Sequence, residues 1–78
     1  MSPSEMEALI LRAVESAGFE LRSMVCSRRG WHHCVDLEVR QPEDTHSLRA
    51  QFFGLTRKQL VKSVFRAYAY PEPCHLAS

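Results

Sequence analysis

Apolar and polar residues alternate in three stretches of the chain, which is the pattern of half-buried strands. These stretches are residues 19–26, 34–40 and 48–53. In the first two, the odd-numbered residues, which are apolar except for Ser23, are expected to face the core. A hairpin pairs residues that share a face, so only a few registers are open to these two strands.

Charge favours one register for this hairpin. Placing Val25 opposite Val35 sets acidic residues against basic ones on the outer surface, whereas a slip by one allowed step sets two glutamates against each other. We therefore predict the first register, with these pairs: Glu20 with Arg40, Arg22 with Glu38, and Cys26 with Cys34. A third strand with Val39 opposite Leu48 would place Arg49 beside Glu38.

Apolar residues at helical spacing mark one helix on each side of the strands. The first helix begins with a capping box, in which Ser2 is the N-cap, Pro3 is the first helical residue and Glu5 is the reciprocal partner. Gly18 is placed to cap its C-terminus.

The second helix, residues 57–70, carries only basic charges. Thr56 is the expected N-cap with Gln59 as its capping-box partner, and Leu55 and Leu60 stand at the two positions of a hydrophobic staple. The proline at position 71 ends the helix, because a residue before proline is driven out of the α region.

These elements predict an α+β domain of the αβββα type, with a three-stranded antiparallel meander and both helices on one face. Residues 1–70 form this domain, and residues 71–78, PEPCHLAS, are expected to be a flexible tail.

At 78 residues the core is small, and ten basic residues nearly balance nine acidic ones, so the bulk charge indicates no class of partner. We find no signal-peptide pattern and no apolar run of membrane length, and expect a cytoplasmic protein with no membrane partner. Three cysteines, an odd number, argue against a disulfide scaffold.

Basic residues at the start of the second helix are the first candidate site. The first N–H groups of a helix are unpaired and its dipole is positive there, so Arg57 and Lys58 disfavour the helix unless an anion binds. The alternative is an ordinary solvated helix end.

The hairpin tip mixes cations and aromatic rings, as nucleic-acid-binding surfaces do. Trp31 shares its parity with the buried positions, however, and is expected to cover the edge of the core. The candidate phosphate-binding residues are Arg28, Arg29, His33, Arg57, Lys58 and Lys62.

Catalysis, cofactors and metals have little support. Cys26, Cys34 and the tip histidines lack the closely spaced ligand pairs of zinc sites, and Cys74 and His75 lie in the expected tail. A Cys–His nucleophile would also need a third group and a pocket. We expect free cysteines, no cofactor and no enzymatic activity.

The element order resembles that of double-stranded-RNA-binding domains over nearly the whole chain. Gly30 and His33 match the spacing of that family's Gly and His in the tip, and Arg57 and Lys58 stand where its paired lysines begin the last helix. Trp31 stands where the family has proline. The resemblance implies RNA contacts from the first helix, the hairpin tip and the start of the last helix.

The chain is also similar to a family of short uncharacterised pseudomonad proteins. The shared pieces are an N-terminal helix, the Phe19-Glu20-Leu21 strand leading to Cys26, a hairpin, and a strand that passes through Gly54-Leu55 into an amphipathic helix. That family has no assigned activity to carry over.

Two functions follow as hypotheses. The first is a protein-interaction or self-association module that uses the outer sheet face near Met24, Cys34 and Phe53. The alternative is a nucleic-acid binder, of RNA or DNA, that uses the six candidate phosphate-binding residues.

Overall fold

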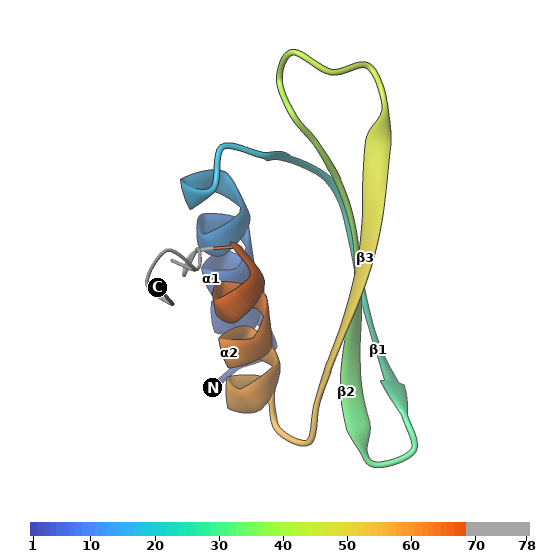
Figure 1. The fold of residues 1–78 in the computed structure, drawn as a ribbon. Coiled ribbons are helices and arrows are strands. Elements are labelled where there is room, and N and C mark those ends of the chain that lie inside the picture. The colour runs from blue at the N-terminus through green and yellow to red at the C-terminus, as the bar shows by residue number, and fades with distance from the viewer. Residues whose placement is uncertain (69–78) are drawn as a thin grey trace, which may run out of the picture.

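The computed structural model describes residues 1–68 of the chain, so the expected tail lies outside the described residues. The elements follow in the order α1 (Pro3–Ser16), β1 (Glu20–Arg29), β2 (His32–Arg40), β3 (Ser47–Gly54) and α2 (Arg57–Tyr68). The three strands form one antiparallel sheet in the order β1-β2-β3. Figure 1 shows both helices on the same face of this sheet, which confirms the predicted fold class.

Helix α1 begins and ends as the sequence predicts. The Ser2 side chain accepts a hydrogen bond from the N–H of Glu5, and the Glu5 carboxylate accepts one from the N–H of Ser2. At the other end, the N–H of Gly18 donates to Glu15 and the N–H of Phe19 donates to Val14, which is the Schellman motif. Gly18 has a φ of 85°, a conformation that glycine adopts without a steric penalty.

Helix α2 is capped in a slightly different way from the prediction. Thr56 Oγ1 accepts from the N–H of Gln59 at 3.1 Å, as expected of an N-cap. The Gln59 side chain, however, reaches past Thr56 and accepts from the N–H of Leu55 at 3.1 Å. Leu55 remains 56 % exposed, so more than half of its side chain is not covered by the expected hydrophobic staple with the buried Leu60.

The core lies between the central strand and the two helices. Strand β2 forms the sheet side of this core, because β2 is paired on both edges and the helices cover one of its faces. The buried core residues come from α1, β2 and α2: Met6, Ile10, Ala13, Val14, Val35, Leu37, Val39, Leu60, Val61 and Val64.

A β-bulge at Arg22 changes the register of the first hairpin. Glu20 pairs with Arg40 and Leu21 with Val39, as predicted, but Ser23 then pairs with Glu38. One extra residue in β1 therefore separates these pairs, and every later residue of β1 changes face. The predicted pairing of Arg22 with Glu38 is wrong for this reason.

The bulge also overturns the expected pairing of the two hairpin cysteines. Cys26 pairs with Val35 and Cys34 pairs with Ser27. Cys26 now lies on the side of the helices, where partial burial and the nearby Glu7 carboxylate of α1 raise the pKa of its thiol. Cys34 lies on the outer face.

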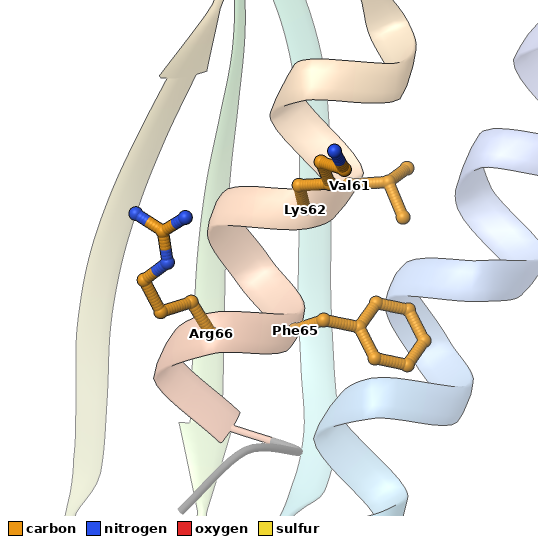
Figure 2. Close-up of a pocket in the computed structure, with 4 residues that line it drawn as sticks. All are labelled: Val61, Lys62, Phe65 and Arg66. Carbon is orange, nitrogen blue, oxygen red and sulfur yellow. The ribbon is translucent and has the colours of Figure 1, made fainter. Parts of the chain in front are cut away.

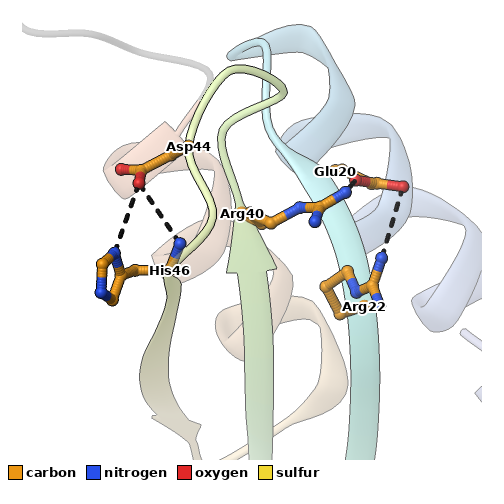
Figure 3. A network of polar contacts seen from close by, with 5 residues as sticks. All are labelled: Glu20, Arg22, Arg40, Asp44 and His46. Carbon is orange, nitrogen blue, oxygen red and sulfur yellow. Dashed lines mark hydrogen bonds and ion pairs between the residues drawn. The ribbon is translucent and has the colours of Figure 1, made fainter.

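The second pairing, between β2 and β3, follows the prediction, with Val39 opposite Leu48 and Glu38 opposite Arg49. At this end of the sheet the charged groups are paired. The Arg40 guanidinium donates to the Glu20 carboxylate at 2.7 Å, and the Arg22 guanidinium lies 3.8 Å from the same carboxylate. Both arginines lower the pKa of Glu20, and the hydrogen bond from Arg40 has the largest effect. Figure 3 shows these three residues close to the β2–β3 loop.

Gly54 is where α2 meets the sheet. A Cβ on this residue would lie 2.4 Å from the backbone nitrogen of Leu60 and 2.8 Å from its Cα. The first turn of α2 therefore packs directly on the backbone of β3, which only glycine permits. Gly54 also pairs with His33 of β2, so the helix begins next to the central strand.

Replacing Gly54 with alanine should destabilise the fold by roughly 1–3 kcal/mol, because the new methyl group forces α2 away from β3. Chemical denaturation measures this loss as a change in the free energy of unfolding. Ser47→Ala, in an exposed position at the other end of β3, is the control and should change that free energy by less than about 0.5 kcal/mol. Equal stability of the two variants would contradict the close packing.

Candidate functional site

One end of the molecule gathers the N-termini of both helices, the β1–β2 hairpin tip and the β3–α2 turn (Figure 1). The helices run in the same direction, so their positive dipole ends lie at this end together. We call it the basic end, and define it by Arg28, His33, Arg57 and Lys58.

A hollow of about 300 Å³ lies at the start of α2. Thr56, Arg57 and Lys58 line it from the helix, and His33 lines it from β2. The hairpin and the helix start, which are separated by more than twenty residues in the sequence, thus form one surface. Met1 and Leu55 complete the lining.

Positive charge converges on His33. Arg28 is its partner across the β1–β2 pair, and Arg57 approaches from α2. Partial burial and these two guanidinium groups hold the pKa of His33 below its usual value of 6.5. A neutral imidazole at neutral pH presents one donor and one acceptor, and it becomes a further cation when an anion raises its pKa.

The two helix N-termini differ in how their charge is balanced. At α1 the Glu5 carboxylate accepts from the Ser2 backbone, a bond that lowers the Glu5 pKa and supplies negative charge to the helix start. The first turn of α2 contains no acidic residue. Its Arg57 guanidinium instead donates to the backbone oxygen of Met1 at 3.2 Å.

The cations of the basic end contrast with those at the opposite end of the sheet. Within residues 1–68, every ion pair involves Glu20 or Asp44, and both lie at the β2–β3 loop end shown in Figure 3. In this part of the chain, Arg28, Arg57 and Lys58 take part in none of them. Their charges are available to a ligand.

Arg29 belongs to a different surface from Arg28. Adjacent residues of a strand point to opposite faces, and Arg29 lines a hollow of about 410 Å³ on the outer face of the sheet with Asp36, Arg49 and Gln51. In that hollow the Gln51 amide donates to the Asp36 carboxylate at 2.7 Å. Of the six candidate phosphate-binding residues, Arg29 is therefore separated from His33 by the sheet itself.

Lys62 lies further along α2, outside the basic end. It lines a separate groove of about 310 Å³ together with Val61, Phe65 and Arg66. Figure 2 shows Val61 and Phe65 pointing toward α1, while Arg66 extends to the other side of the helix. Four of the six candidates, Arg28, His33, Arg57 and Lys58, thus come together and two do not.

Trp31 does not cover the core, although its odd-numbered position, which it shares with the core-facing strand residues, predicted that it would. Its side chain is 82 % exposed, more than any other large apolar side chain in the described residues. Gly30 and Trp31 form a two-residue turn between the paired residues Arg29 and His32. The turn takes Trp31 out of the strand alternation, which is why its parity gave the wrong environment. A Gly-Trp pair between two strands was the signal that could have revealed it.

The predicted protein-interaction surface is divided by the structure. The bulge places Met24 on the helix side, where it packs against the core, and Cys34 is only 1 % exposed. Phe53 remains on the outer face with 44 % of its surface exposed, and the His32 ring lies edge-on to it at 6.4 Å. Val25, which was expected in the core, is 55 % exposed on the same face because of the bulge.

Cys34 and His33 do not line a common cleft. They are neighbours in β2 and so point to opposite faces of the sheet, and Cys34 is buried. Among residues 1–68, no group of three His, Cys, Asp or Glu side chains is placed to hold a metal ion. Cys74 and His75 lie outside the described residues.

No family model, curated protein or solved structure matches this chain. None of the helices within residues 1–68 is long and apolar enough to cross a membrane.

The pKa of His33 should respond to the charges around it. Because its pKa is lowered in the folded protein, folding is opposed when His33 must be protonated, and the free energy of unfolding should fall as the pH drops below 6.5. Arg57→Gln should raise the His33 pKa, and saturating inorganic phosphate should raise it in the unchanged protein. NMR titration of the His33 ring protons measures both effects.

Lys62→Gln removes the same charge from α2 outside the basic end and is the control for this titration. It should leave the His33 pKa unchanged. Equal shifts in the two variants would contradict the proximity of Arg57 to His33.

Proposed function

We propose that this protein is a non-enzymatic nucleic-acid-binding domain that holds the phosphate backbone at the basic end. The observation that carries the proposal is the hollow at the start of α2, where His33 from the hairpin meets Arg57 and Lys58 from the helix. Arg28 lies beside this hollow as the strand partner of His33. Within the described residues Arg28, Arg57 and Lys58 form no ion pair, whereas Arg22, Arg40 and His46 at the opposite end each pair with a carboxylate.

A phosphate in this hollow would interact both with the unpaired N–H groups at the start of α2 and with the side chains of Arg57 and Lys58. The first N–H groups of α2 have no partner within the helix, and the helix dipole adds positive charge to that of Arg57 and Lys58. Without an anion this arrangement destabilises the start of the helix by about 0.3–1 kcal/mol for each unfavourable charge. A bound phosphate turns the same groups into favourable contacts.

The layout of the ends also supports nucleic acid as the source of the phosphate. In double-stranded-RNA-binding domains, the hairpin tip and the start of the last helix contact the backbone, and here those two segments share one end of the molecule. The third contact of that family, the first helix, is acidic on balance here, because α1 exposes Glu7 and Glu15 against the single basic residue Arg12. We therefore assign the backbone contact to the basic end alone.

Replacing Arg57 and Lys58 together with glutamine should weaken binding and make it less sensitive to salt. Loss of two phosphate contacts should reduce the slope of log K against log salt by about 1.4–1.8. Fluorescence anisotropy of labelled duplex RNA, single-stranded RNA and duplex DNA, titrated at several salt concentrations, measures this slope.

The double variant Lys62→Gln with Arg66→Gln removes the same charge from the same helix at the other groove. Its slope and affinity should stay close to those of the unchanged protein. Equal losses in the two double variants would mean that only net charge matters, and absence of binding at low salt would refute the proposal.

Protein interaction through Phe53 is the second candidate, favoured by the exposed ring on the outer face and by the free edges of β1 and β3. If this is the function, Phe53→Ser should weaken association at least about 30-fold, with little dependence on salt. Analytical ultracentrifugation tests self-association. Leu48→Ser, an exposed apolar residue of the same strand on the opposite face, should have no effect.

A further inference from the structure

We infer that Trp31 stacks on an unpaired base, so that the ligand of the basic end is a single-stranded or looped nucleic acid rather than a continuous duplex. This inference rests on the proposed function and specifies its ligand. It adds to the phosphate contacts a residue that the sequence pattern had assigned to the core.

The exposure of Trp31 is the first argument. A large aromatic side chain that is 82 % exposed contributes little to the core, since most of its apolar surface stays in water. The chain has only this one tryptophan, and its turn neighbour is a glycine. An aromatic ring in this position is suited to a flat apolar partner, and a nucleic-acid base presents such a face whatever its sequence.

The turn holds the backbone of Trp31 in a defined place. The strands are paired up to Arg29 and His32, which leaves only Gly30 and Trp31 between them. Gly30 has a φ of 60° and no other residue of the turn has a positive φ, which is the pattern of a type II′ turn with glycine in the first position. Because the backbone of so short a turn is fixed, little backbone freedom is lost when the ring is covered, and only the two side-chain torsions of Trp31 have to be ordered.

Trp31 also lies at the right spacing from the phosphate hollow. His33, which lines the hollow, is two residues along the chain from Trp31, so their Cα atoms are at most roughly 7 Å apart. Arg28, the partner of His33 across the hairpin, lies on the same side of the tip as His33. A nucleotide whose phosphate occupies the hollow can therefore place its own base or the adjacent base against Trp31.

A continuous duplex cannot use this ring in the same way. Its bases are stacked on one another, and their faces are closed to a side chain except at an end, a bulge or a loop. The cations of the basic end would hold either form, so Trp31 is the residue that distinguishes them.

The single tryptophan allows the inference to be tested with the unlabelled protein. Excitation at the red edge of the absorption band selects Trp31 over the two tyrosines. The probes are a single-stranded RNA, the same strand in a complete duplex, inorganic polyphosphate, and vesicles of anionic lipid. We expect quenching by the single strand, and none by polyphosphate even when NMR shifts at Arg57 and Lys58 show that it is bound.

Trp31→Ala should weaken binding of the single strand by about 5-fold to 150-fold, the range expected for one stacked base. It should leave the affinity for polyphosphate and for the duplex unchanged. Trp31→Phe, which keeps a flat ring, should retain most of the affinity for the single strand. Both variants alter an exposed residue, so thermal unfolding should show an unchanged fold.

The outcomes separate this inference from the proposed function. If single strand and duplex both bind in a salt-dependent way but Trp31→Ala affects neither, the stacking inference is wrong and the phosphate contact stands. If no probe binds at low salt, both are wrong. A blue shift of Trp31 fluorescence with vesicles, together with no response to RNA, would assign the basic end to a membrane surface and overturn the inference.

Discussion

The close contact between Gly54 and Leu60 is the constraint on which the arrangement of the basic end depends. Because no Cβ fits between them, α2 begins directly on the backbone of β3, one strand away from His33. This brings the cations of the first helical turn to the same end as the hairpin tip. Lys62, one turn further along α2, is carried to a separate groove. The position of a single glycine thus decides which basic residues lie together.

The bulge at Arg22 has an equally wide effect on the sheet. Before it, β1 follows the alternation of its sequence, and after it every side chain changes face. Met24 moves toward the core while Val25 moves to solvent, and Cys26 is separated from Cys34 by the sheet. The outer face consequently keeps Phe53 as its exposed aromatic ring and gains the exposed Val25, but it loses Met24, and Cys34 is only 1 % exposed there.

Charge is distributed unevenly between the two ends of the molecule. Arg40 and Glu20 are paired near the β2–β3 loop, and their interaction ties the two strands together. At the basic end the cations surround His33 and oppose its protonation, and those at the helix start also oppose the helix dipole. Local arrangements that work against stability are expected where a site is kept for a ligand. An anionic partner would relieve both effects.

The sequence by itself determined the order of the elements, the caps at Ser2 and Thr56, and the αβββα class, because capping and periodicity depend on residues within a few positions of one another. It also identified the basic helix start and the basic hairpin tip as candidate sites. Tertiary structure alone decided the register after Arg22 and, with it, the separation of Arg29 from His33. These features depend on pairing partners in other strands and on a helix that packs from above, and such contacts leave no local pattern in the chain.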